Sequence, residues 1–391
     1  MRKRKVLIDA RILPSKVGGV QTYIEGLAEG FTINDYLGIE RHWLVDKIGS
    51  DWINGIVPKR DGIIICKTRH AYELPEDDEK KTVLNIGRRR KNLSDLDERL
   101  PREPLEVRAL NPSLIHFCSQ DAFLTNVPSI YHPHDLQHRI FPENFSPEEI
   151  DWRDSAWKIY AQNSKCVVVG TSHVKADLNK YWDIPQSRIK VIELAPLTTG
   201  GRSNSEILWE KPAGEITLVY PSAYYEHKNH LNLLRAISIL LKDFPNLKLR
   251  LLGGEFKEDS QVTKTISELG IQKFVVQHGW VTRQQLDTVL SQSDLMIVPS
   301  TYESASFPII EAQMHNLPFI CSNIPALKAQ VGNKDIFFDP YNPEDLAAKA
   351  KLILLSQDPI GGKLIKFRNW AQVVDDYYQL YKRVQRSKFF D

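Results

Sequence analysis

Two separate blocks of alternating apolar runs and amphipathic stretches constrain the fold of this chain more than any other feature. In the second half, Ile216–Tyr220 and Leu295–Pro299 are short apolar runs that predict buried strands, and Leu247–Leu252 is predicted as a strand as well. Helical patterns such as His230–Lys242 and Arg283–Ser291 lie between such runs, with short loops on either side. This alternation predicts an α/β fold in which helices cover both faces of a parallel sheet.

The first half of the chain shows the same alternation. It opens with a predicted strand, Lys5–Ala10, then a loop that carries Gly18 and Gly19, and a predicted helix, Gln21–Phe31. A chain of 391 residues is long enough for two domains. Later apolar runs predict further strands at Gly62–Cys66, Leu114–Phe117, Ser129–His132, Cys166–Gly170 and Ile189–Leu194.

A segment rich in Gly, Pro, Ser and Thr, residues 196–214, is typical of a linker between the two blocks. We therefore predict two Rossmann-like, doubly wound domains at residues 1–196 and 197–369. Residues 370–391 follow as a C-terminal helix, because the apolar residues from Trp370 to Val384 recur on one helical face. Ligands of such sheets bind at the carboxyl ends of the strands, so a crevice between the two domains is the expected site.

The charge pattern argues against nucleic acid as a partner, because the formal net charge is only +2. The stretch Lys80–Lys91 carries six basic residues and no acidic ones. Such a run favours a solvated loop, and the alternative is a patch for an anionic lipid headgroup or a phosphate-bearing acceptor.

Cysteine use and hydropathy predict a cytoplasmic protein. The four cysteines form no Cys-x-x-Cys pair and lie mostly in apolar runs, which is typical of buried thiols in a reducing compartment. The apolar run at the N-terminus stops at Asp9, which is too short for a signal peptide, and no run is long enough to span a membrane. Peripheral contact with the inner membrane face stays open.

The segment STYESASFPIIEA places Glu303 in a loop after a strand and Glu311 near the start of the next helix. Pro308 suits the first turn of that helix, whose free N–H groups favour a diphosphate. Ionised carboxylates are strong acceptors for sugar hydroxyls. Helix capping is the alternative explanation for both glutamates.

Three further segments could carry chemistry. Lys228 and Asn229 lie at a helix start after a strand, which favours an anion site, although a solvated surface loop is the alternative. Gly18 and Gly19 would allow a phosphate to approach the backbone, although a simple turn is the favoured explanation. His134 and Asp135 follow a strand; a metal site is disfavoured there against a polar loop that contacts a sugar. Asp95 and Asp97 match a metal-binding Asp-x-Asp by chance.

At these residues the chain resembles glycosyltransferase family 4, which is part of the group 1 glycosyltransferases. Its members are retaining enzymes with the two-Rossmann-domain (GT-B) architecture. Four segments carry the resemblance: GGVQTYIEGLAEG, HDLQHRIFPENF, YPSAYYEHKNHLNLLRAI and GWVTRQQLDTVLSQSDLMIVPSTYESASFPIIEA. It implies a donor-binding C-terminal domain, an acceptor-binding N-terminal domain, and a final helix that packs back on the N-terminal domain.

The resemblance also implies the roles of single residues. His134, Lys228 and Glu303 would be catalytic, with Lys228 on the donor diphosphate, Glu303 on the donor sugar and Glu311 on the ribose. No metal or cofactor is implied beyond the nucleotide-sugar co-substrate. The implied acceptor side holds His134 and Asp135, and the implied donor site comprises Gly18, Gly19, Lys228, Asn229, Gly279, Val281, Glu303, Ser306, Phe307 and Glu311.

The resemblance implies transfer of a hexose from a nucleotide-diphosphate sugar to a glycan or lipid-linked acceptor in polysaccharide or glycoconjugate synthesis. GDP-mannose is favoured over a UDP-sugar or dTDP-rhamnose because the family uses it often. The chain departs from the family at Ala223, where an arginine is frequent, and at Ser304–Ser306, which replaces Gly-Phe-Gly. His227 is one candidate to replace the missing cation. The alternatives are a nucleotide-sugar epimerase of the same fold and a non-catalytic nucleotide-sugar-binding protein.

Overall fold

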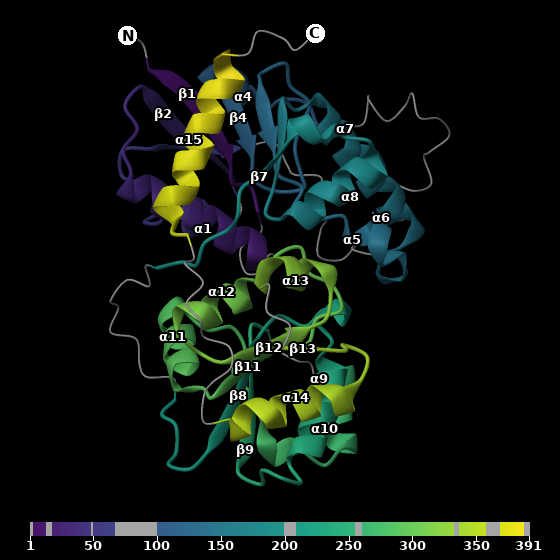
Figure 1. The fold of residues 1–391 in the computed structure, drawn as a ribbon. Helices are drawn as coiled ribbons and strands as arrows, with labels where there is room; N and C mark the ends of the chain where they lie inside the picture. The colour runs from purple at the N-terminus through teal and green to yellow at the C-terminus, as the bar shows by residue number, and fades with distance from the viewer. Residues whose placement is uncertain are drawn as a thin grey trace. The chain divides into compact units, whose positions relative to one another are not determined.

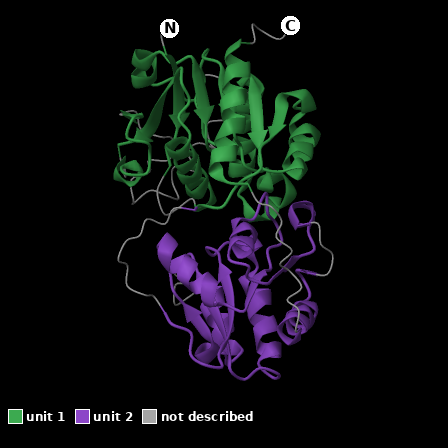
Figure 2. Cartoon of the chain, turned by 60° about the vertical axis from the view of Figure 1, so that its left-hand side comes forward, with its two compact units in different colours: residues 1–197, 368–391 green, residues 198–367 purple. Residues whose placement is uncertain are grey.

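The computed structural model describes residues 3–12, 18–47, 50–66, 100–198, 209–254, 260–331, 336–356 and 368–386. The chain divides into two compact units, residues 1–197 with 368–391 and residues 198–367 (Figure 2). Each unit is a parallel α/β domain, which confirms the predicted fold class. The basic stretch Lys80–Lys91 and the pair Asp95 and Asp97 lie outside the described residues.

The first unit is built on a seven-stranded sheet in the order β3-β2-β1-β4-β5-β6-β7 (Figure 1). All of its pairings are parallel. Its central strands are buried along their whole length, as expected for a sheet covered on both faces. The strands are β1 (Arg4–Asp9), β2 (Ile39–Asp46), β3 (Gly62–Cys66), β4 (Leu114–Phe117), β5 (Ser129–Tyr131), β6 (Cys166–Val169) and β7 (Ile189–Val191).

Helices cover this sheet on both faces. The capping box of Ser146 and Glu149 starts α6, and a π-helical turn, Arg153–Trp157, joins α6 to α7. The final helix, α15, belongs to this unit, although it follows the second unit in the chain. The helices are α1 (Gly18–Ile33), α4 (Leu105–Leu110), α5 (Gln137–Ile140), α6 (Pro147–Trp152), α7 (Lys158–Asn163), α8 (Ser172–Trp182) and α15 (Trp370–Arg386).

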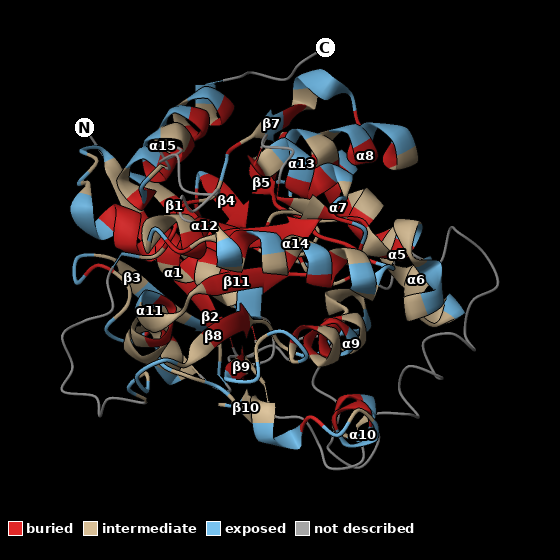
Figure 3. Cartoon of the chain, turned by 60° about the horizontal axis from the view of Figure 1, so that its bottom comes forward, coloured by how far each residue is buried: buried red, intermediate tan, exposed pale blue. Residues whose placement is uncertain are grey.

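The second unit has a six-stranded parallel sheet in the order β10-β9-β8-β11-β12-β13. Its strands are β8 (Ile216–Pro221), β9 (Leu247–Leu252), β10 (Val275–Gln277), β11 (Leu295–Val298), β12 (Phe319–Ser322) and β13 (Phe337–Phe338). Its helices are α9 (His230–Leu240), α10 (Gln261–Glu268), α11 (Arg283–Gln292), α12 (Phe307–Met314), α13 (Pro325–Val331) and α14 (Pro343–Leu355). Figure 3 shows the buried sheets flanked by helices whose outer faces are exposed.

In the first unit, one strand was not predicted and one helix start was predicted wrongly. The sequence pattern did not predict β2, because Glu40, Arg41 and His42 interrupt its apolar residues. The Arg41 guanidinium is buried in a bidentate ion pair with Asp61, whose carboxylate also accepts the indole N–H of Trp43 at 2.9 Å. These partners satisfy polar groups that would otherwise disfavour a buried strand.

The second error concerns the start of α1. Gly18 and Gly19 form the first turn of this helix rather than a loop before it. Neither residue is among those with a positive φ, so the helix needs no glycine there for conformational reasons. The residues that precede Gly18, 13–17, lie outside the described part of the chain.

Two glycines of α1 allow α15 to approach it closely. A Cβ atom added at Gly26 would lie 1.9 Å from Cε2 of Trp370, and one added at Gly30 would lie 2.4 Å from the Trp370 carbonyl oxygen. Both distances are far below van der Waals contact, so only glycine fits. The indole ring of Trp370 is fully buried in this contact. The C-terminal segment is therefore an integral part of the first unit's core.

Candidate active site

In the second unit, two predicted site residues meet at the point where the strand order reverses. Lys228 follows β8 and Glu303 follows β11, the neighbouring strand on the other side of this switch point. The ammonium group of Lys228 donates to Oε1 of Glu303 at 2.7 Å. Open α/β sheets bind ligands outside the carboxyl ends of strands at such a point. The topology thus brings together two residues that are 75 positions apart in the sequence.

A buried hydroxyl relay fixes the orientation of Glu303. The Ser300 hydroxyl donates to Oε1 of Glu303 at 2.7 Å and lies 3.0 Å from the Tyr220 hydroxyl. Oε1 thus accepts from both Lys228 and Ser300, and no described residue hydrogen-bonds to Oε2. The carboxylate is therefore held on one oxygen and available on the other. The sequence pattern did not single out Ser300 or Tyr220, because neither lies in the glutamate motif itself.

The side-chain amide of Asn229 hydrogen-bonds to neighbouring loops of the second unit. Its backbone has a φ of 60°, and its side-chain NH₂ donates to the carbonyls of Pro299, at 2.8 Å, and Pro340, at 2.7 Å. The Thr301 N–H also donates to the His227 carbonyl at 2.8 Å. These bonds lock the loop after β8 against the loop after β11. Both N–H groups of the Asn229 side chain already donate to these carbonyls. Any contact of Asn229 with the nucleotide-sugar donor would therefore involve other atoms of the residue.

Glu311 lies in a separate buried cluster. Arg283, the first residue of α11, donates from Nη1 to Oε1 of Glu311 at 2.6 Å. Asp287 lies 2.9 Å from Nη2 of Arg283 and 3.1 Å from Nε2 of His315. Burial raises the pKa of the Glu311 carboxyl, and the Arg283 guanidinium opposes that rise. The sequence pattern missed Arg283, because nothing in its spacing links it to Glu311.

The other predicted donor-site residues of this unit lie between β10 and α11 or at the start of α12. Gly279 follows β10 with a φ of 66°, and its carbonyl accepts the Gly253 N–H at 2.8 Å. Val281 is half-buried and packs against the core. Ser306 is buried before α12 and its N–H donates to Gln330 at 2.9 Å, while Phe307 is the first residue of that helix. That backbone donor is therefore already used.

His227 is a buried imidazole next to Lys228. Burial, reinforced by the neighbouring charge of Lys228, lowers the pKa of His227 to about 3. A neutral imidazole adds no positive charge at pH 7, and the replacement of the family's arginine at Ala223 by His227 stays a prediction. Lys228 and Arg283 are the cations bonded to the two predicted glutamates.

In the first unit, His134 follows β5 and has a strained backbone with a φ of 63°. Its Nε2 lies 2.8 Å from the Cys118 carbonyl oxygen, which can only accept, so Nε2 carries the proton. Burial lowers the pKa of His134 to about 4, so the ring is neutral at pH 7. Nδ1 is then a lone-pair acceptor, and no described residue donates to it. This geometry suits contact with a sugar hydroxyl.

Aromatic rings pack against the His134 ring. The His132 and His134 rings stack with centroids 4.1 Å apart, and the Tyr23 ring packs edge-on against both. The Tyr23 hydroxyl lies 2.5 Å from that of Tyr377 in α15. Stacked rings do not converge on a cation, and the described residues hold no group of His, Cys, Asp and Glu side chains that could bind a metal ion.

Asp135 has a local structural role. Its Oδ1 accepts the Gln137 N–H at 3.2 Å, just before α5, and its own N–H donates to the Pro133 carbonyl at 2.8 Å. These bonds shape the turn that follows His134. A contact between Asp135 and an acceptor stays a prediction.

Gly18 and Gly19 are exposed at the start of α1, and an added Cβ at either would meet nothing within 4 Å. Neither backbone angle nor packing within the described residues therefore requires glycine. We expect Gly19→Ala to raise the free energy of unfolding by about 0.5–1 kcal/mol, because alanine is the better helix former. If a donor phosphate approaches here, the same variant should raise KM for the donor. Urea unfolding and steady-state kinetics measure the two effects separately, and an unchanged KM would contradict the phosphate contact.

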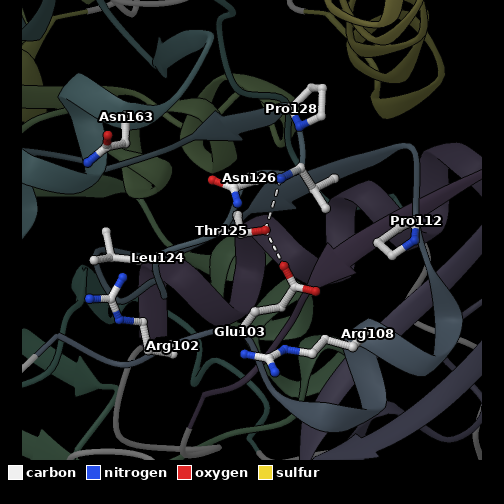
Figure 4. Close-up of a pocket in the computed structure, with 10 residues that line it drawn as sticks. Arg102, Glu103, Arg108, Pro112, Leu124, Thr125, Asn126, Pro128 and Asn163 are labelled. Atoms are coloured by element: carbon white, nitrogen blue, oxygen red, sulfur yellow. Dashed lines mark hydrogen bonds between the residues drawn. The ribbon is translucent and has the colours of Figure 1, made fainter.

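A pocket of about 760 Å³ in the first unit lies away from these residues (Figure 4). It is lined by α4 and by the segments before β4 and β5, including Arg108, Pro112 and Pro128. Glu103 in its wall accepts the Thr125 hydroxyl. Because Pro112 and Pro128 precede their strands, the pocket is at the amino ends of the sheet. None of the predicted site residues lines it.

Comparison with known proteins agrees with this geometry. The model of the family "Glycosyl transferases group 1" matches residues 204–369, which contain Lys228, Glu303 and Glu311. Residues 204–369 therefore form a group 1 glycosyltransferase domain, and the chain is a glycosyltransferase. It is 22% identical over 299 residues to O-antigen chain mannosyltransferase B of Escherichia coli, covering 70% of this chain and 77% of that protein.

Two further proteins show how far the similarity of this glycosyltransferase to known proteins extends. A D-inositol 3-phosphate glycosyltransferase of Nocardiopsis dassonvillei is 23% identical over 241 residues, and the match spans 55% of each chain. The structure of sucrose-phosphate synthase from Thermosynechococcus elongatus superposes with a TM-score of 0.71 at 17% identity, covering 98% of this chain and 99% of that one. The structural match shows the GT-B fold. Among the described residues, no helix of this glycosyltransferase combines the length and apolarity needed to cross a bilayer.

Proposed function

We propose that this glycosyltransferase moves a hexose from a nucleotide-diphosphate sugar to a hydroxyl of a glycan or lipid-linked acceptor, with retention at the anomeric carbon. The observation that carries the proposal is the Lys228–Glu303 pair at the switch point of the second sheet. The two side chains complement the two parts of a sugar diphosphate, one anionic and one rich in hydroxyl groups. The diphosphate binds the ammonium group, and the sugar hydroxyls donate to the carboxylate.

Lys228 acts on the leaving group. Negative charge on the diphosphate grows as its bond to the sugar breaks, so a fixed positive charge stabilises the transition state more than the ground state. Glu303 keeps Oε2 for a sugar hydroxyl, because Lys228 and Ser300 occupy Oε1. The proposal assigns the positive field to this chain's own lysine, so we expect activity without an added divalent cation.

The chemical step is a same-face displacement. The bond between the anomeric carbon and the diphosphate oxygen breaks, and the acceptor oxygen bonds to the same face of an oxocarbenium-like carbon. The acceptor's hydroxyl proton passes to the departing diphosphate oxygen. Glu303 is already ion-paired with Lys228, so we assign it to hydroxyl binding and not to nucleophilic attack. His134, neutral and with Nδ1 as its acceptor atom, accepts a hydroxyl hydrogen bond on the first unit's side.

The nature of the donor and acceptor is part of the proposal. The similarity to a mannosyltransferase of O-antigen chains supports mannose from GDP-mannose and a growing saccharide as acceptor. A UDP-sugar and dTDP-rhamnose are the other donors, because the phosphate and ribose contacts are common to all three. We propose a cytoplasmic enzyme, with peripheral membrane contact through Lys80–Lys91 when the acceptor is lipid-linked.

A panel of nucleoside diphosphates tests donor binding directly. We expect one of GDP, UDP and dTDP to raise the melting temperature, because a ligand at 100 times its dissociation constant adds about 2.7 kcal/mol of stability. Product analysis with the matching nucleotide sugar then separates transfer from epimerisation. A transferase forms a glycosylated product only when acceptor is present, whereas an epimerase releases nucleotide or epimer without one. Absence of any shift with all three diphosphates contradicts the proposal.

A further inference from the structure

The second glutamate of the motif, Glu311, is almost fully buried and would be costly to keep charged alone. Its side chain is 8% exposed, and Arg283 in α11 holds Oε1 at 2.6 Å. The position of Arg283 is fixed, because the capping box of Thr282 and Gln285 starts α11 at this residue. Burying a carboxylate without a partner costs several kcal/mol, or else the group takes up a proton.

The two glutamates are arranged in the same way. Glu303 accepts from Lys228 on Oε1, and Glu311 accepts from Arg283 on Oε1. No described residue donates to Oε2 of either carboxylate. A carboxylate held on one oxygen by a cation, with the other oxygen unoccupied, is oriented to receive hydroxyl groups. Arg283 therefore holds the Glu311 carboxylate in the same way that Lys228 holds the Glu303 carboxylate.

We propose that Arg283 is a positioning residue of the donor site, which holds the Glu311 carboxylate charged and aimed so that Oε2 accepts the ribose hydroxyls of the donor nucleotide. The inference rests on the proposed donor binding at Glu311. It adds a residue outside the glutamate motif, on a different helix, to the machinery that recognises the nucleotide.

The charges around Glu311 show why an arginine is needed. Asp287 in α11 adds a second negative charge, and His315, which follows the last residue of α12, lies 3.1 Å from Asp287. Burial and Asp287 raise the pKa of the Glu311 carboxyl, whereas Arg283 and His315 lower it. Arg283 contacts both acids, and it makes the strongest opposing contribution. Without its charge, Glu311 protonates at a higher pH and becomes a weaker acceptor.

Arg283 also has unused hydrogen-bonding capacity. Its Nε and Nη2 atoms are buried and donate no hydrogen bond to any described residue, although Nη2 lies 2.9 Å from Asp287. Buried guanidinium donors are normally satisfied. We therefore expect water to satisfy these atoms, so that Arg283 acts on the nucleotide through Glu311.

The test measures dissociation constants by calorimetry for UDP and GDP and for their 2′,3′-dideoxy forms, which lack the ribose hydroxyls. We expect Arg283→Met to weaken binding of the better ribonucleotide about tenfold to a hundredfold, the range for hydrogen bonds to a charged group. The loss should grow as the pH falls, because the pKa of the Glu311 carboxyl is raised and loss of Arg283 raises it further. Binding of the dideoxy form should change little. Arg283→Lys, which keeps the charge, should recover part of the affinity.

Two further variants keep the inference falsifiable. Arg235→Met removes an exposed arginine of α9 in the same unit and should leave binding unchanged. The double variant Arg283→Met/Glu311→Gln removes both buried charges, so it can be measured even if Arg283→Met alone unfolds. If Arg283 acts only through Glu311, the double variant should bind the nucleotide no more weakly than Glu311→Gln alone. Equal losses for the ribo and dideoxy forms, or additive losses in the double variant, overturn the role of Arg283. If the wild-type protein binds neither UDP nor GDP, the proposed function itself fails and the inference fails with it.

Discussion

Replacing Lys228 by alanine should lower kcat about a hundredfold to a thousandfold, the cost of removing one preorganised group that stabilises transition-state charge. The expectation follows from the position of the ammonium group, 2.7 Å from Glu303 at the switch point of the second sheet. KM for the donor should rise less than kcat falls, because charge on the leaving diphosphate increases only as its bond to the sugar breaks.

Loss of Lys228 also leaves Glu303 without its cation, so stability must be measured alongside activity. Urea unfolding of the variant shows whether the fold persists, and the assay is run well below the melting temperature. Lys242→Ala is the matched control, because Lys242 is an exposed lysine of the same unit that lies outside the site. Unchanged turnover in folded Lys228→Ala would remove Lys228 from the mechanism and leave the proposed function without its main support.

Replacing Gly30 by alanine should destabilise the first unit by about 1–3 kcal/mol, the usual cost of overpacking a well-packed contact. The new Cβ would lie 2.4 Å from the Trp370 carbonyl oxygen and 2.6 Å from Cγ1 of Val374. A backbone atom cannot turn aside as a side chain can, so α15 has to move. Alanine gains about 1 kcal/mol in helix propensity over glycine, which reduces the loss without cancelling it.

Gly19→Ala is the matched control for this effect, because it is the same substitution in the same helix where nothing lies within 4 Å. The two variants should shift the midpoint of urea unfolding in opposite directions. If Gly30→Ala were as stable as the wild-type protein, the close contact between α1 and α15 would not exist in solution.

How much the sequence predicts differs between the two units, for a physical reason. A strand of the second unit such as β11 is buried on both faces, so it forms a continuous apolar run that a pattern detects. The short β13 and helix α13 were not predicted. In the first unit, β2 escaped detection because its polar residues find partners, such as Asp61 for Arg41, that only the fold supplies.

The candidate site divides in the same way. Spacing and resemblance alone selected Lys228, Glu303, Glu311 and His134, because each lies in a recognisable local motif. Only the fold shows that Lys228 and Glu303 bond to each other and that the Asn229 amide holds two loops together. Burial in the fold, which no local pattern encodes, also lowers the pKa of His227.

The sequence by itself determined the strand and helix alternation, the two-domain order and the motif residues, because apolar periodicity and local spacing are properties of neighbouring residues. Tertiary structure alone decided which residues far apart in the chain touch. Arg283 reaches Glu311, and Gly30 meets Trp370, only after parallel strands and packed helices have brought their segments together. Contact, burial and the resulting charge states depend on that three-dimensional arrangement, which no local pattern encodes.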